Sequence, residues 1–203
     1  MIRSSTARLF VAVDPPEDVR TQLAEWARSA SKAGDGRVRA NASLRLLDPD
    51  LLHVTLCFLG NRPLGEMDSL AAQLAACGGA TDELSLGAPL WLPAQRPRAL
   101  AVELHDNRGK LARLQAEVVG ALQEVSGWQP NDGTRAAEGA PKAQRRFHPH
   151  ITVARMRQGA ASYERVLPPT PSLSFVPGEL VLYRSWLSPE GAGYEAVASH
   201  RIG

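Results

Sequence analysis

Two copies of one four-residue pattern hold the side chains best suited to chemistry in this sequence. The first is His53-Val54-Thr55-Leu56, and the second, 97 positions later, is His150-Ile151-Thr152-Val153. On a β-strand, successive side chains point to opposite faces, so each histidine shares a face with its threonine and the apolar residues face the core. Two such units facing each other would supply an acid, a base and two hydrogen-bond donors. That combination suits chemistry on a phosphodiester.

The repeat of this pattern is itself informative. The chain has five histidines and seven threonines among 203 residues. Two histidines followed by threonine two places later would arise by accident about 1% of the time, even before the apolar positions are counted. A single copy would be a weak signal, but the pair indicates a shared function.

Composition places the chain among ordinary soluble globular proteins. It is 44% apolar and 22% charged, a length and balance that fit one domain. The net charge of +2 gives no strong overall field toward nucleic acid. The positive charge is mostly arginine, which suits bidentate phosphate contacts. The abundant alanine and glycine also indicate a GC-rich genome, which explains the arginine equally well.

The two cysteines, Cys57 and Cys77, are too few for a disulfide framework, which indicates a reducing compartment. Cys57 follows the first motif on the parity of His53, where a nucleophile is conceivable, but a buried inert thiol is the usual state of such a residue. No secretory signal or membrane span is visible. We therefore expect a cytoplasmic protein.

The apolar patterns predict an α+β fold with largely antiparallel sheets. Asp14 is placed to cap the first helix, residues 60–63 are expected to close the first motif strand, and residues 131–142 are expected to form a long loop. We expect one domain over residues 1–203, built as two pseudo-twofold lobes with one motif each. Their sheets would face a central groove, with helices outside. The predicted strands cover 8–13, 44–47, 52–59, 83–90, 99–104, 147–155, 173–176, 179–186 and 194–200, and the helices 17–31, 64–77 and 107–126.

Four segments spread over nearly the whole chain carry a resemblance to a known family. They are Arg8 to Pro16, Leu52 to Gly60, Phe147 to Arg155, and Leu182-Tyr183-Arg184-Ser185. With them the chain resembles the 2H phosphoesterase superfamily, and within it the RNA 2′,3′-cyclic phosphodiesterases once called 2′–5′ RNA ligases. Two features depart from that family. Leu46 stands where an aromatic residue usually follows the arginine aligned with Arg45, and residues 131–142 form an insertion.

The resemblance implies a bilobal fold with both motifs in a basic groove. It implies hydrolysis of a terminal 2′,3′-cyclic phosphate of RNA to a 2′-phosphate, without metal or organic cofactor. We also expect a monomer. His150 would be the base toward water and His53 the acid toward the ribose 3′-oxygen. Imidazole suits both roles because it titrates near pH ~6.5.

The remaining site residues are expected to bind the substrate. Thr55 and Thr152 would donate hydrogen bonds to the non-bridging phosphate oxygens. Arg155 matches a family position associated with phosphate, but simple alternation puts it on the face opposite His150, so it needs a bulge or strand end to reach inward. Phe10 matches a position that lines the groove, where it would stack on a base or pack in the core.

Three alternatives stay open. His148-Pro149-His150 places two imidazoles on one face as metal ligands can be, but no further cluster completes a zinc site, and no metal is expected. The same chemistry could serve ADP-ribose cyclic phosphate or a 2′–5′ linked oligonucleotide. A non-catalytic RNA-binding module could also use such a groove, although binding alone does not require paired proton carriers.

Overall fold

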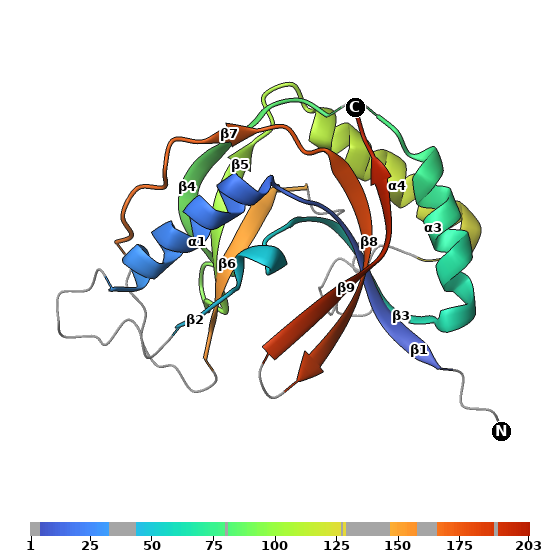
Figure 1. The fold of residues 1–203 in the computed structure, drawn as a ribbon, viewed down its shortest axis with the longest axis horizontal. Coiled ribbons are helices and arrows are strands. Elements are labelled where there is room, and N and C mark those ends of the chain that lie inside the picture. Colours follow the sequence, from blue (N-terminus) through green and yellow to red (C-terminus); the bar gives the residue numbers. More distant parts are fainter. Residues whose placement is uncertain are drawn as a thin grey trace, which may run out of the picture.

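A computed structural model describes residues 5–32, 44–79, 81–126, 128, 147–157, 166–188 and 191–203 (Figure 1). The expected loop at 131–142 lies outside these ranges. The helices are α1 (Glu17–Lys32), α3 (Met67–Ala76) and α4 (Lys110–Ser126), with short 3₁₀ helices η1 (Pro49–Leu51) and η2 (Leu64–Glu66). The strands are β1 (Thr6–Val13), β2 (Leu44–Leu46), β3 (Val54–Pro63), β4 (Leu84–Leu92), β5 (Ala99–His105), β6 (His150–Met156), β7 (Ser174–Phe175), β8 (Glu179–Ser188) and β9 (Gly191–Arg201).

The strands form one open antiparallel sheet with the order β7-β4-β5-β6-β3-β1-β8-β9, and β2 pairs with the free part of the β6 edge. This confirms the predicted α+β class. Two separate sheets were expected. Instead, the half around β6 and the half around β3 meet through the pair Val54–Ile151, the one pairing between these strands in the described part of the chain.

The two halves of the sheet interleave along the chain. The first strand, β1, and the last two, β8 and β9, lie with β3, whereas β2, β4, β5 and β7 lie with β6. Antiparallel pairing allows this because each strand needs only a neighbour of opposite direction, not its neighbour in sequence. The two motif strands thus become central strands of the sheet although 97 residues separate their histidines.

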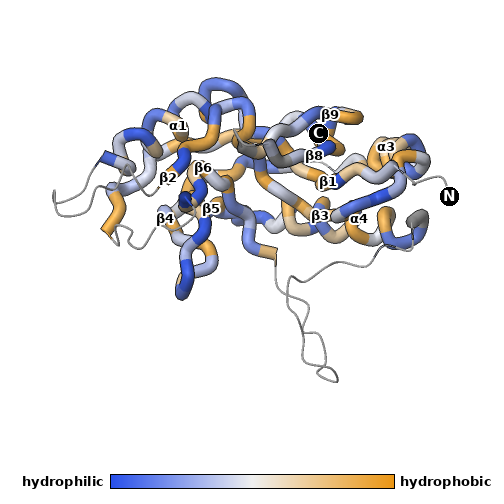
Figure 2. Tube along the Cα trace, turned by 90° about the horizontal axis from the view of Figure 1, so that it is seen from below, coloured by the Kyte–Doolittle hydropathy of each residue, from blue (hydrophilic) through white to orange (hydrophobic). Residues whose placement is uncertain are grey.

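Helices cover the faces of the motif strands that carry apolar side chains. α1 packs against β2, η1 and β6, while α3 and α4 pack on each other and on the half that contains β3, β8 and β9. Figure 2 shows α1 on one side of the molecule and α3 with α4 on the other. Leu23 of α1 and Leu114 of α4 are buried, as the helical period predicts. Burial of each such side chain stabilises the fold by about 1.5–3 kcal/mol.

Two local predictions are wrong. β3 continues through Gly60 to Pro63, because Gly60 adopts a φ of 72° and forms a bulge opposite Leu9 instead of ending the strand. Asp14 does not cap α1. Its Oδ2 accepts a 2.6 Å hydrogen bond from the Tyr183 hydroxyl, and its buried Oδ1 has no hydrogen-bond partner among the described residues.

None of the helices in the described ranges combines the length and apolar character needed to cross a membrane.

Candidate active site

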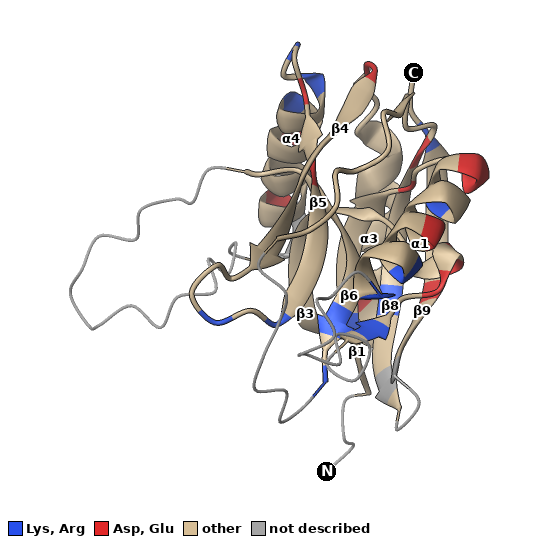
Figure 3. Ribbon diagram, turned by 90° about the vertical axis from the view of Figure 1, so that its left-hand side faces the viewer, with Lys and Arg blue, Asp and Glu red and all other residues tan. Residues whose placement is uncertain are grey.

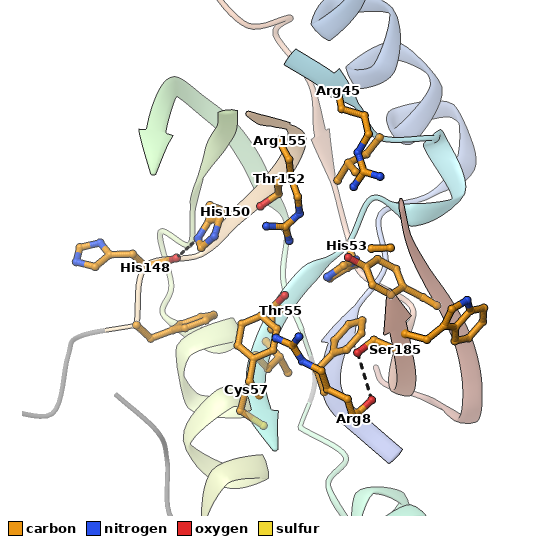
Figure 4. Close-up of a pocket in the computed structure, with 18 residues that line it drawn as sticks. Arg8, Arg45, His53, Thr55, Cys57, His148, His150, Thr152, Arg155 and Ser185 are labelled. Atoms are coloured by element: carbon orange, nitrogen blue, oxygen red, sulfur yellow. Dashed lines mark hydrogen bonds between the residues drawn. The ribbon is translucent and has the colours of Figure 1, made fainter. Parts of the chain in front are cut away.

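The bridge between Val54 and Ile151 brings the two motifs together. Each bridging residue directly follows a motif histidine and precedes a motif threonine. In an antiparallel ladder, the residue after Val54 faces the residue before Ile151. This register sets Thr55 beside His150 and His53 beside Thr152. The side chains of all four residues line one groove (Figure 4).

The motif strands share the same burial pattern over six residues. In both, the histidine and threonine are partly buried, the residues after each are buried, and the position five after the histidine is exposed. A bulge in each strand causes this shared burial pattern. Leu56 is the extra residue of β3 against β1, and Val153 is the extra residue of β6 against β5. Alternation is reversed beyond each bulge, so Arg155 reaches the groove. Phe58 occupies the equivalent place on β3.

The groove has a volume of about 810 Å³, which is large enough for a nucleotide-sized ligand. None of the described residues that line it is Asp or Glu, whereas Arg8, Arg45 and Arg155 all line it. In Figure 3 one group of basic segments lies where β6, β8 and β1 come together, other basic segments lie beside α4, and acidic segments lie on α1. A chain with a net charge of only +2 thus concentrates positive charge at this groove.

The two motif histidines are held in the same way. His53 Nδ1 lies 2.8 Å from the carbonyl oxygen of Leu51, and His150 Nδ1 lies 2.8 Å from that of His148. A carbonyl oxygen only accepts, so each Nδ1 carries a proton and donates it. The other ring nitrogen, Nε2, is left for the groove. Each imidazole can therefore accept a proton when neutral and donate one when charged.

An aromatic wall packs around His53. Its ring centroid lies 4.8 Å from that of Phe10 and 5.3 Å from that of Tyr194, which meets it edge-on. This burial lowers the pKa of His53 to about 4, against the weaker opposing effect of the Leu51 hydrogen bond. The positive charges of Arg155 and of protonated His150 make smaller contributions to the same lowering of the pKa. His53 is thus neutral near pH 7 in the ligand-free protein.

The ring of Phe10 packs against the ring of His53. Phe10 is 2% exposed, and its ring contacts His53 as well as Tyr183, whose ring stacks on it at a centroid distance of 5.1 Å with an interplanar angle of 18°. Little of its ring is left for a base, so we assign it the support of His53 in place of base stacking. The Tyr183 hydroxyl donates a hydrogen bond to Asp14, which precedes α1, so this bond ties the aromatic rings to that end of the helix. Burial raises the pKa of Asp14.

The groove also contains residues that the sequence analysis did not single out as site residues. Phe58 and Trp186 are 55% and 47% exposed, which is unusual for large apolar side chains. Trp186 lies against Gly193 across the β8–β9 pair, where a Cβ would clash with its ring. The exposed aromatic residues offer stacking surfaces for a base. The other lining residues not proposed from sequence are Arg8, Arg45, Leu47, Leu56, Phe147, Ser185, Ala192 and Tyr194.

Cys57 and His148 also line the groove. Cys57 is 8% exposed, and burial raises the pKa of its thiol to about 12, so it is a neutral thiol and a poor nucleophile. Within the ranges that the structure describes, no three His, Cys, Asp or Glu side chains come together as a metal site would require. The backbone carbonyl of His148, rather than its ring, contacts His150.

Comparisons with known proteins identify the family of this chain. Residues 15–185 match the model of the 2′-5′ RNA ligase superfamily. An RNA 2′,3′-cyclic phosphodiesterase of Thermus thermophilus is 32% identical over 195 residues, covering 92% of this chain and 86% of that protein. The structure of TT0787 from Thermus thermophilus superposes with a TM-score of 0.69 at 28% identity, covering 96% and 97% of the two chains.

A further solved structure has the same fold. The Escherichia coli LigT structure in complex with 3′-AMP gives a TM-score of 0.72 at 23% identity, covering 98% of this chain and 99% of that one. The family match spans most of the chain, including both motif strands. The chain therefore belongs to the 2′-5′ RNA ligase superfamily.

Proposed function

We propose that this protein hydrolyses the 2′,3′-cyclic phosphate at the end of an RNA to a 2′-phosphate, with His53 and His150 as its paired acid and base. The observation that carries the proposal is the Val54–Ile151 bridge, which sets the two motif histidines on one groove. The name of the Thermus thermophilus relative, an RNA 2′,3′-cyclic phosphodiesterase, supports the substrate class.

The reaction needs two proton movements. A water oxygen attacks phosphorus while its proton passes to Nε2 of neutral His150. The bond between phosphorus and the ribose 3′-oxygen breaks, and that oxygen takes a proton from Nε2 of charged His53. Water is thus added across the bond between phosphorus and the 3′-oxygen. After the step His150 holds an extra proton and His53 lacks one, and proton exchange with solvent restores both. General acid–base catalysis of this kind contributes about 10²–10⁴ per group.

The burial of His53 has a consequence for its role as the acid. With a pKa of about 4, it holds no proton near pH 7 in the free protein. The phosphate anion brings negative charge against the ring and opposes the charge of Arg155. Substrate binding therefore raises the pKa of His53, so the acid acquires its proton in the complex.

The other groove residues complete the site. Thr55 and Thr152 donate hydroxyl hydrogen bonds to the non-bridging oxygens, where charge builds in the transition state. Arg155 adds a guanidinium that reaches the same groove because of the Val153 bulge. Phe58 and Trp186 provide exposed rings for the terminal base.

Product analysis tests this proposal. An oligonucleotide with a 2′,3′-cyclic end, incubated with protein in EDTA, should yield a terminal 2′-phosphate by ³¹P NMR. A 3′-phosphate product, or turnover only with added metal, would contradict the proposed reaction. Competition with ADP-ribose cyclic phosphate and with a 2′–5′ linked oligonucleotide would show whether either is the better substrate. Tight RNA binding without turnover would favour a non-catalytic module.

The assignment of acid and base has its own test. In a substrate with sulfur in place of the ribose 3′-oxygen, the leaving group is a thiolate, which needs little help from an acid. If His53 is the acid, His53→Ala should recover most of its lost rate on this substrate, while His150→Ala should not. Recovery by His150→Ala instead would reverse the two roles without removing the pair.

A further inference from the structure

Two arginines stand directly opposite each other at one side of the groove. Arg45 of β2 is the cross-strand partner of Arg155 of β6. Directly opposite residues of an antiparallel pair have Cβ atoms about 5 Å apart, so two long side chains on the same face reach the same space. Both residues line the groove, and Figure 4 shows both guanidinium groups directed into it.

A guanidinium presents donors in a planar fork that matches phosphate oxygens. Two such forks directed into one groove can hold the oxygens of a single phosphate or of two neighbouring ones. The arrangement therefore favours phosphate groups as the ligands of this arginine pair.

This arginine pair extends the site beyond the reacting centre. Arg155 is close enough to His53 for its charge to lower the pKa of that ring, so it borders the scissile phosphate. Arg45 lies one strand further along, and in Figure 4 Arg8 lies on the other side of the histidines. A second phosphate at Arg45 would thus belong to the same ligand but not to its reacting group.

We infer that Arg45, beside Arg155 at the scissile phosphate, binds the phosphodiester that precedes the terminal nucleotide, so that the groove selects an oligonucleotide over a cyclic mononucleotide. The inference rests on the proposed function for the identity of the terminal group. A cyclic mononucleotide has no second phosphate, whereas every longer RNA end has one at the next linkage. The charge of that linkage is then the feature that Arg45 recognises.

Three substrates separate this role from general attraction of nucleic acid. They are adenosine 2′,3′-cyclic phosphate, the ApA dinucleotide with the same cyclic end, and that dinucleotide with an uncharged methylphosphonate linkage. For the wild type, kcat/KM should be about tenfold or more higher with the charged linkage than with the neutral one, as a charge-assisted hydrogen bond predicts. Arg45→Gln should reduce this ratio to between one and about three.

Arg184→Gln is the matched control, because Arg184 is an exposed arginine of β8 that does not line the groove and lies 4.0 Å from Glu195. It should keep the wild-type ratio. A ratio unchanged in Arg45→Gln, or lost in Arg8→Gln instead, would overturn the inference. If the wild type opened none of the three substrates, the proposed function would fail. Calorimetric binding of the two dinucleotides would then still decide whether Arg45 senses the linkage charge.

Discussion

Val54 of β3 and Ile151 of β6 form the bridge on which the two halves of the sheet meet, and each directly follows a motif histidine. Both side chains are fully buried. The same pair therefore serves the core and sets the relation between the two imidazoles. Stability and activity are coupled at this point of the fold.

Truncation of this bridge should damage both properties. Ile151→Ala should lower the free energy of unfolding by about 2–5 kcal/mol, and Ile151→Val by about 0.5–1.5 kcal/mol, measured by urea unfolding. Leu114→Ala in α4 is a matched core truncation far from the bridge, at 1% exposure. At equal loss of stability, Ile151→Ala should lose more kcat than Leu114→Ala. Equal kcat in the two variants would contradict the coupling.

The pKa of His53 should be measurable by NMR of labelled histidine. In the ligand-free protein its ring should titrate near pH 4, well below its ordinary value near 6.5. The unfolded chain then binds more protons between these pH values, so this group's contribution to stability is present at pH 7 and is lost as pH falls from about 6.5 to about 4. As pH falls through that window, the wild type should lose unfolding free energy that His53→Gln does not lose. Titration near 6.5 would contradict the assigned burial effect.

The aromatic wall should control that pKa. Phe10→Leu opens the face on which His53 rests, so the pKa of His53 should rise toward 6.5. Tyr183→Phe keeps the stacked ring but removes its hydrogen bond to Asp14. It should leave the pKa of His53 in place while lowering stability by about 1–3 kcal/mol. If Phe10→Leu left the NMR titration of His53 unchanged, the aromatic wall would not be the cause of the low pKa of His53.

The two threonines should act through their hydroxyl groups. Thr55→Val and Thr152→Val keep the volume and remove the donor, and each should lower kcat by about 10²–10³. Thr55→Ser and Thr152→Ser keep the donor and should stay within about tenfold of wild type. Steady-state kinetics on one cyclic-ended oligonucleotide provides all four values. Valine variants as active as the serine variants would show that the hydroxyls contribute nothing.

Much of the fold could be predicted from local patterns. Periodicity places α1 and α4 within a few residues of their observed bounds, and the alternation of His53 with Thr55 and of His150 with Thr152 indicates correctly that each pair shares the groove face. These features depend only on the period of a helix or strand, which neighbouring residues in the sequence reveal.

The remaining features depend on partners distant in sequence. The bulges at Leu56 and Val153 exist only relative to β1 and β5, so alternation alone assigns Arg155 to the wrong face and gives no reason to select Phe58. The cross-strand position of Arg45 likewise requires the β2–β6 register. The positive φ of Gly60, which continues a strand that glycine was expected to end, depends on pairing with β1.

The most direct test of the paired histidines is a double-variant cycle on an RNA oligonucleotide with a 2′,3′-cyclic end, in EDTA. His53→Ala and His150→Ala should each lower kcat by about 10²–10⁴. The double variant should lose far less than the product of the two single effects, because residues that act as one unit are not additive. His105→Gln, outside the groove, should retain wild-type turnover. Near-wild-type turnover in either single variant, or strictly multiplicative losses in the double variant, would contradict the account.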